Sequence, residues 1–308
     1  IQMITFKVVV TAGLLTIGGA LVLNQEMNIG QFVAAEIIII LVIASVEKLI
    51  LGLETFYDVL TSFEKLGEVV DKTIESQEGE KSNLSDSLTI DFERVGYRVE
   101  DRDLPILNNI SFRITPKCRI LITGKSGSGK SSLLRLISGV IQPTSGNIIV
   151  NNMSLESINL NYYRSQIGIS LSEETPFIGT IWENITFGNP NITDEEVYKA
   201  LDNVGLTEFI REQKSGLQTI LHPEGRTMAH TTSKKIILAR AIVTKPKLLI
   251  LEDPLDLVED LEADKIIEFL ARTDNPWSLV IVARNHNWKT YCNQIISLDG
   301  GELKSNTQ

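Results

Sequence analysis

The chain has 308 residues, is 43% hydrophobic and carries a formal net charge of −10 at pH 7. Its hydrophobic fraction excludes a globally disordered chain, its length is typical of about two domains, and Cys118 and Cys292 are too few for a disulfide framework. The acidic balance argues against general nucleic-acid binding, because a phosphate backbone requires a basic surface, so we expect no nucleic-acid partner. The charge is unevenly distributed: residues 1–53 contain two Lys and three Glu, a net of −1, so −9 lies downstream.

Two apolar segments open the chain. Val8 to Gln25 contains no charged residue and is long enough for a membrane-spanning helix. A short polar patch follows, and a second segment runs from about Ile29 to Leu53 with Glu36 inside it. The pattern predicts a transmembrane hairpin, with a buried soluble helix as the alternative for the second segment. In a membrane, Glu36 has to face other helices or a polar cavity, because a charge facing lipid costs about 2.5–3.5 kcal/mol.

Basic residues indicate the orientation of this hairpin. Its loop has no Lys or Arg, whereas Lys7, Lys48, Lys65 and Lys72 lie on the other side. By the positive-inside rule the loop is outside and both ends are cytoplasmic. We therefore expect a multi-pass protein of the cell (inner) membrane, in contact with membrane lipid, with a cytoplasmic downstream domain. The start at Ile1, without a basic region or cleavage site, disfavours a cleavable signal peptide and suggests part of a longer chain.

Three parts are expected in chain order. Residues 54–76 carry apolar side chains at helical spacing and predict a cytoplasmic extension of the second helix, which completes a membrane part over 1–76. Residues 77–87 are polar and predict a linker. The downstream domain then covers 88–308. Its first strands are expected at 88–92, 106–114 and 119–123.

The strongest motif follows the last of these strands. Residues 124–131, GKSGSGKS, match G-x-x-x-x-G-K-[ST] between an apolar strand and a helix. Glycines let the backbone curl so that its N–H groups face phosphate oxygens. Lys130 would reach the β- and γ-phosphates, and the Ser131 hydroxyl would bind Mg²⁺. The candidate nucleotide-binding residues are Gly124, Ser126, Gly127, Ser128, Gly129, Lys130, Ser131 and Ser132.

Further segments resemble the ATP-binding domain of ABC transporters of the exporter type. They are Pro143–Ile148, Gly179–Ile185, Leu238–Ala241, Pro246–Leu251 and Ile295–Gly301. The hairpin resembles the last two membrane helices of such exporters. The resemblance implies an α/β P-loop NTPase fold of the ABC type with a helical subdomain, and ATP and Mg²⁺ as cofactors. It also implies a second ABC half, paired head to tail so that each ATP lies between one phosphate loop and the partner's signature segment. The implied function is an ATP-binding subunit that couples ATP binding and hydrolysis to export of a peptide, protein or other hydrophobic cargo.

The chain departs from the family's pattern at the catalytic positions. Where the family has Asp-Glu, Glu252 stands at the Mg²⁺ position and Asp253, one methylene shorter, at the position of the water-activating base. An alternative register puts Asp253 at the Mg²⁺ position and Pro254 at the base position. Ser172 replaces the Q-loop glutamine and is too short to reach the metal or water. Arg284 replaces the switch histidine and cannot shuttle protons near neutral pH.

The signature segment departs as well. Met228–Thr232 replaces L-S-G-G-Q, so His230 and Thr231 stand where glycines permit close approach to the γ-phosphate. We expect helix-cap and surface roles for these two residues. Val99 replaces the aromatic that stacks on adenine, and Tyr97 is expected to face the core. The phosphate loop Gly124–Ser131 predicts ATP binding, and these departures predict inefficient hydrolysis. Two hypotheses follow: a half-exporter that hydrolyses ATP, or a catalytically weak regulatory or architectural subunit in a homodimer or beside a competent partner.

Overall fold

The computed structural model describes residues 2–72, 74–75, 78–81, 87–100, 102–222, 228–284 and 288–307. The chain divides into two compact units, Ile1–Ser76 and Gln77–Gln308. The expected linker over 77–87 lies partly outside the described residues. In its described part, Glu80 forms a parallel bridge with Ile158, so this stretch is attached to the second unit.

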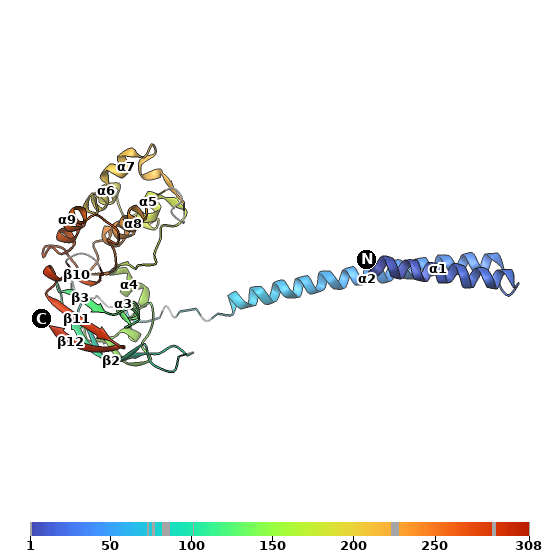
Figure 1. Ribbon diagram of the computed structural model, residues 1–308, viewed down its shortest axis with the longest axis horizontal. Coiled ribbons are helices and arrows are strands. Elements are labelled where there is room, and N and C mark those ends of the chain that lie inside the picture. Colours follow the sequence, from blue (N-terminus) through green and yellow to red (C-terminus); the bar gives the residue numbers. More distant parts are fainter. Residues whose placement is uncertain are drawn as a thin grey trace. The chain divides into compact units, whose positions relative to one another are not determined.

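The first unit is a pair of helices, α1 (Gln2–Leu23) and α2 (Ile29–Val70), drawn in blue in Figure 1. Each is long and apolar enough to cross a membrane, and the apolar window of α2 has none of its residues buried. The prediction of two long apolar helices is therefore confirmed. α2 is continuous, so the extension expected over 54–76 exists as helix as far as Val70, with Asp71 as the C-cap.

Side-chain contacts between the two helices hold them together. Lys7 on α1 forms an ion pair with Glu47 on α2. Nearer the loop, the ring of Phe32 lies so close to Gly18 that an added Cβ there would come within 2.4 Å of it. Both contacts join residues on opposite sides of the loop, so the helices run antiparallel, as a hairpin requires. A glycine at such a crossing lets helix backbones approach, which is common where helices pack in lipid.

A six-stranded sheet forms the centre of the second unit. Its order is β12-β11-β3-β10-β9-β6, and every neighbouring pair is parallel except β11 with β12. The bounds are β3 Arg119–Gly124, β6 Ile167–Ser170, β9 Leu248–Glu252, β10 Ser278–Val282, β11 Gln294–Asp299 and β12 Glu302–Thr307. β9 and β10 are buried along their whole length. Strands covered on both faces are continuously apolar, as these sequences are.

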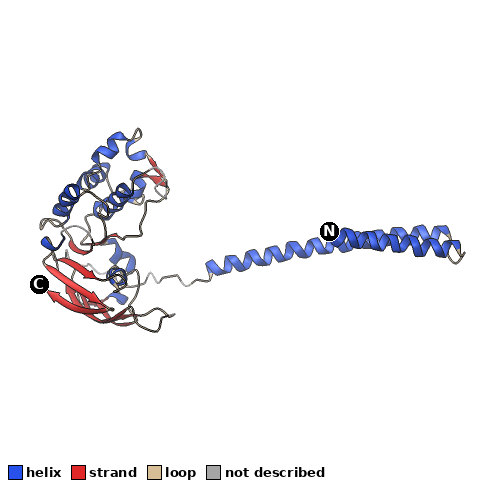
Figure 2. Cartoon of the chain, viewed as in Figure 1, coloured by secondary structure: helices blue, strands red, loops and turns tan. Residues whose placement is uncertain are grey.

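The two faces of this sheet belong to two hydrophobic cores. Leu249 and Leu251 of β9 pack with helices α8 (His230–Val243) and α9 (Asp260–Leu270). Leu248 and Ile250 of the same strand pack in the other core, with α3 (Lys130–Ile137) and α4 (Leu160–Ser165). Alternate side chains of one strand thus serve opposite layers, which is the pleat of a parallel sheet between helices. Figure 2 shows these strands in red with helices beside them.

A second, antiparallel sheet shares the core of α3 and α4. Its order is β2-β1-β4-β5. The bounds are β1 Ile90–Tyr97, β2 Leu107–Ile114, β4 Ser145–Val150 and β5 Met153–Ser154, with the 3₁₀ turn η1 at Leu155–Ser157. Phe92 and Phe112 stack across the β1–β2 pair, with ring centroids 4.7 Å apart. The strands expected over 106–114 and 119–123 are β2 and β3, whereas the strand expected at 88–92 starts at Ile90 and continues to Tyr97.

A helical subdomain lies between β6 and β9 in the sequence (Figure 1). Its elements are β7 Gly179–Thr180, α5 Ile181–Thr186, α6 Asp194–Asn203, α7 Thr207–Glu212, η2 Gly216–Gln218, β8 Ile220–Leu221 and α8. α8 packs against α5, α6 and β6, and all but one of the residues from Ser233 to Val243 are buried. The remaining elements of the unit are α9 and the 3₁₀ turn η4 at Trp288–Thr290. The helical subdomain is thus attached to the sheet mainly through α8.

Candidate nucleotide-binding site

The candidate site lies where four neighbouring parallel strands end. In the sheet order β3-β10-β9-β6, the phosphate loop follows β3, Arg284 follows β10, Glu252 ends β9 and Ser172 follows β6. The carboxyl ends of parallel strands meet at one sheet edge, which is the usual ligand-binding edge of such folds. Residues separated by up to 160 positions in the chain are brought to one edge by this order.

Three glycines shape the phosphate loop, and they differ in their surroundings. Gly124, Gly127 and Gly129 have φ values of +150°, +78° and +96°. A Cβ at Gly124 would lie 2.3 Å from the carbonyl oxygen of Leu298, and one at Gly129 would lie 2.6 Å from Leu107 Cδ2. A Cβ at Gly127 would meet nothing within 4 Å. The outer glycines therefore let the loop pack against its neighbours, while Gly127 faces open space.

Lys130 and Ser128 complete the loop. Lys130 is the first residue of α3, and its Nζ donates to the carbonyl oxygens of Gly124, at 2.8 Å, and Lys125, at 2.7 Å. Burial lowers the pKa of Lys130, the positive charge of Arg284 adds to this, and nearby carboxylates oppose it. Ser128 Oγ is buried and has no hydrogen-bond partner among the described residues. A loop with an available hydroxyl and a cation at a helix start fits a phosphate group.

Ser131 and Glu252 meet across the site. The Ser131 hydroxyl donates to Glu252 Oε1 at 2.5 Å, and Glu252 is only 7% exposed at the end of β9. Hydroxyl and carboxylate oxygens are the ligands that Mg²⁺ prefers. Among the described residues no group of three or more His, Cys, Asp or Glu side chains is placed to hold a metal. Mg²⁺ is usually held by one or two protein oxygens together with substrate phosphates and waters, so the Ser131 and Glu252 oxygens fit a cation bound with a nucleotide.

The carboxylate of Asp253 is bound by Arg284. The backbone N–H of Arg284 donates to Asp253 Oδ1 at 2.9 Å, and the guanidinium Nε lies 3.4 Å from Oδ2. Asp253 has a left-handed backbone, with φ of +43°. Burial raises the pKa of its carboxyl, and the N–H and charge of Arg284 oppose that rise. Both oxygens of the residue at the base position thus already have partners.

Ser172 and the signature segment lie on the side of α8. Ser172 is exposed, and its backbone carbonyl accepts a hydrogen bond from Lys234 of α8. α8 begins at His230 with Ala229 as its N-cap, and this N-cap forms no side-chain hydrogen bond. The expectation of a cap position for His230 and Thr231 is therefore wrong, because they are the first two residues of α8 and follow its N-cap. Thr231, also expected at the surface, is partly buried. His230 is exposed, as expected.

The predictions for the segment expected to contact adenine, and for the residues near the switch position, have different outcomes. Tyr97 is partly buried and packs against the core, as predicted. Val99 is 41% exposed. His286, the nearest histidine to the switch position, lies outside the described residues.

Lys234 is a charged residue that the motif comparison did not single out. It is 4% exposed, and the carboxyl groups of Glu174, Asp253 and Glu252 are close enough to oppose the lowering of its pKa by burial. The sequence alone gives little indication that Lys234 is important, because α8 is buried on almost all sides and its lysines follow no regular pattern. Only the fold reveals that Lys234 donates to the backbone carbonyl of Ser172, which follows β6.

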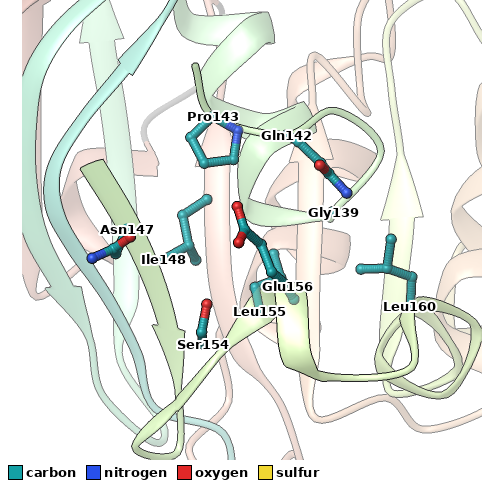
Figure 3. A pocket seen from close by; sticks show the side chains of 9 residues that line it. All are labelled: Gly139, Gln142, Pro143, Asn147, Ile148, Ser154, Leu155, Glu156 and Leu160. Atoms are coloured by element: carbon teal, nitrogen blue, oxygen red, sulfur yellow. The ribbon is translucent and has the colours of Figure 1, made fainter. Parts of the chain in front are cut away.

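A separate hollow lies between the antiparallel sheet and α4. Figure 3 shows its lining, which includes Pro143, Glu156 and Leu160. The cavity volume is about 10 Å³, the size of a single water. It is therefore no site for a nucleotide, and the edge with the phosphate loop remains the candidate.

Comparison with known proteins agrees with this geometry. Residues 107–256 match the family model described as ABC transporter. The structure of a bacterial Atm1-family ABC exporter with ATP bound superposes with a TM-score of 0.72 at 22% identity, covering 82% of this chain and 45% of that one. The downstream unit is an ABC transporter ATP-binding domain. The predicted ABC-type α/β fold, preceded by two long apolar helices, is confirmed.

Curated relatives align with nearly the whole chain. The alpha-hemolysin translocation ATP-binding protein HlyB of Escherichia coli O157:H7 is 31% identical over 301 residues, which are 98% of this chain and 42% of that protein. The leukotoxin translocation ATP-binding protein LktB of Mannheimia haemolytica is 28% identical over 289 residues, 94% of this chain and 41% of LktB. The chain thus spans about two fifths of the length of these relatives.

Proposed function

We propose that this chain is the ATP-binding part of an ABC-type membrane exporter, which couples ATP binding and slow hydrolysis to export. The observation that carries this proposal is the contact of Ser131 with Glu252 beside the phosphate loop. This contact places a phosphate-binding loop and two oxygen ligands for a cation at the same edge of the sheet. The names of the HlyB and LktB relatives add support for a peptide or protein cargo.

In this proposal the loop Gly124–Ser131 and the start of α3 bind the phosphates. Backbone N–H groups and the Lys130 ammonium neutralise their charge, and Ser132 follows in the first turn of the helix. Ser131 and Glu252 would hold Mg²⁺, which would supply positive charge to neutralise part of the phosphate charge. The Ser131–Glu252 hydrogen bond supports the register in which Glu252, not Asp253, serves the cation.

Slow hydrolysis follows from the residues at the catalytic positions. Asp253 is shorter than the usual glutamate, and Arg284 occupies both of its oxygens, so it is poorly available as a base for water. Ser172 offers no side chain of sufficient length, and its carbonyl is bound by Lys234. Arg284 remains able to pair with a phosphate oxygen, because its side chain is 78% exposed.

A second candidate function is a catalytically weak regulatory or architectural subunit. Two observations favour this second function: the ion pair of Asp253 with Arg284, and the side chain of His230 at the start of α8. In this case the chain binds ATP and works beside a second ABC half with intact catalytic residues, or as a homodimer that cycles poorly. Both candidates place α1 and α2 in the cell (inner) membrane among lipid, with the ATP-binding domain on the cytoplasmic side.

The test is nucleotide binding and steady-state ATPase activity of the full-length protein in lipid, with and without its candidate partner. We expect ATP binding that Lys130→Ala reduces by at least about a hundredfold, because the main phosphate cation is lost. Unchanged ATP affinity in Lys130→Ala contradicts the site. Turnover that appears only with the partner selects the second candidate function, beside a competent half, and turnover of the chain by itself excludes that arrangement.

A further inference from the structure

The connection between β1 and β2, residues 98–106, lies next to the phosphate loop. It is closed by a hydrogen bond from the Ile106 N–H to the Tyr97 carbonyl oxygen at 2.8 Å. A Cβ at Gly129, the N-cap of α3, would lie 3.0 Å from the Ile106 carbonyl oxygen and 2.6 Å from Leu107 Cδ2. The end of this connection, called the β1–β2 turn below, is therefore packed against the loop that binds phosphate in the proposed function.

The phosphate chain of a bound nucleotide has a direction at this site. Ser131 follows β3 and meets Glu252 at the end of β9, so the proposed cation ligands lie on the β10 and β9 side of the loop. A cation held with a nucleotide contacts its β- and γ-phosphates, which therefore lie on this side. The β1–β2 turn lies on the other side, beside β11, since a Cβ at Gly301 in the β11–β12 turn would lie 2.5 Å from the Ile106 carbonyl oxygen. The nucleoside, at the far end of the phosphate chain, therefore points to the β1–β2 turn.

The apolar side chains that this turn exposes are aliphatic. Val99 is 41% and Leu104 is 76% exposed, and residues 98–106 contain no aromatic residue. The nearest ring in the sequence, that of Tyr97, packs against the core. Aliphatic contact is non-directional, and it lacks the π face on which a base stacks for a gain of about five- to a hundredfold in affinity. The turn therefore offers a nucleoside weak contact that is the same for every base.

Polar backbone groups of the turn are engaged within the fold. The Arg98 N–H donates to Thr144 Oγ1 at 3.1 Å, and this hydroxyl donates to the Gly96 carbonyl oxygen at 3.2 Å. The Arg102 N–H donates to the Val99 carbonyl oxygen at 3.1 Å. A site selects one hydrogen-bonding ligand over another when its own donors and acceptors are left unpaired by the wrong one. These groups already have partners, so they do not read the edge of a base.

We propose that this site recognises the triphosphate group and not the base, so that GTP and inorganic triphosphate bind with affinities close to that of ATP. This inference rests on the proposed ATP site at Gly124–Ser131 and names the class of ligand that the site accepts. The affinity comes from the loop, whose backbone N–H groups and Lys130 ammonium serve phosphate oxygens alone. Val99 is the residue that determines the lack of base selectivity, because a ring at this position would stack on the base.

The test is competition against labelled ATP in equilibrium dialysis, with the full-length protein in lipid and excess Mg²⁺. The competitors are unlabelled ATP, GTP and inorganic triphosphate. We expect the inhibition constants of GTP and of inorganic triphosphate to lie within about tenfold of that of ATP. A constant that is weaker than that of ATP by more than this factor, for either competitor, overturns the proposal, because the nucleoside or its base is then recognised.

Val99→Tyr adds the ring that the turn lacks. It should raise the affinity for ATP and for GTP by at least about fivefold, and leave the affinity for inorganic triphosphate, which has no base, unchanged. The matched control is Val140→Tyr, because Val140 is 53% exposed and lies beyond the other end of α3. This control should change none of the three affinities. Thermal unfolding followed by tryptophan fluorescence shows whether each variant is folded.

The outcomes separate this inference from the proposed function. Unchanged ATP affinity in folded Val99→Tyr, or an equal gain in Val140→Tyr, overturns the position of the nucleoside at the β1–β2 turn, and with it this inference alone. If Val99→Tyr does not fold, the competition in the unsubstituted protein still decides. Absence of binding of all three ligands, or binding that Lys130→Ala leaves unchanged, overturns the proposed function together with it.

Discussion

Two glycines of the phosphate loop provide a matched pair for substitution. At Gly124, φ is +150° and an added Cβ would lie 2.3 Å from the carbonyl oxygen of Leu298 and 2.6 Å from Ser128 Oγ. That carbonyl cannot retreat easily, because Leu298 of β11 is paired with Gly124 in the sheet. At Gly127, φ is +78° and an added Cβ meets nothing within 4 Å. Gly124→Ala therefore adds a clash to backbone strain, and Gly127→Ala adds strain alone.

The magnitudes follow from these surroundings. A left-handed backbone costs a residue with a Cβ about 1–2 kcal/mol, which is the expected loss for Gly127→Ala. At Gly124 the conformation is almost exclusive to glycine and the contact is with backbone, so the loss should reach about 3 kcal/mol or more. At about 2–4 °C per kcal/mol for a domain of this size, Gly124→Ala should lower the unfolding midpoint by at least about 6 °C.

Tryptophan fluorescence is a suitable assay, because Trp182, Trp277 and Trp288 all lie in the downstream unit. ATP affinity, measured on the same variants, separates stability from binding. Gly127 faces open space at the proposed phosphate position, so Gly127→Ala should weaken ATP binding by about tenfold or more despite its smaller effect on stability. Equal midpoints for the two variants, or a lower midpoint for Gly127→Ala, refutes the packing argument. Undiminished ATP affinity in Gly127→Ala refutes the placement of the phosphates.

Three further predictions concern other parts of the downstream unit. Asp253→Glu by itself should raise ATP turnover far less than the roughly 10²–10⁴-fold that a competent general base supplies, because Arg284, Ser172 and the signature segment are unchanged. A gain in steady-state ATPase rate of that size contradicts the prediction. Arg240→Lys should lower the free energy of unfolding by about 1–3 kcal/mol in denaturant titrations, because Arg240 donates to Asn184 O at 2.6 Å and lies 4.5 Å from the centroid of the Phe187 ring. Arg211→Lys, at an exposed ion pair, is the control and should leave this free energy unchanged. Burial raises the pKa of Cys292 to about 12 and that of Cys118 above its usual value. A maleimide should therefore label these thiols slowly in the folded protein at pH 7.5 and fast in the unfolded protein. Rapid labelling of the folded protein would show that the thiols are accessible.

Local patterns in the sequence were sufficient for much of this structure. The charge-free stretch before Asn24 and the apolar run after Asn28 predict α1 and α2, because helix length and apolarity depend on neighbouring residues. The phosphate loop is equally local, since eight consecutive residues carry both the glycines and the polar groups. Its place between β3 and α3 is as predicted. Element ends were less certain: β1 begins at Ile90, and the N-cap of α8 is Ala229, because caps depend on backbone geometry that composition does not encode.

What the tertiary structure decided is which distant residues meet. β10 lies between β3 and β9, so Arg284 comes to Asp253 while Glu252 comes to Ser131. No spacing in the sequence predicts that Arg284 engages both oxygens of Asp253. Lys234 illustrates the same limit, since a lysine in a helix buried on almost all sides has no pattern to mark it, and the carbonyl to which it donates is that of Ser172, after β6. The sequence thus determined the elements and the phosphate loop by local chemistry. The order of strands in the sheet decided the charges around the site, because strand order alone sets which strand ends are neighbours.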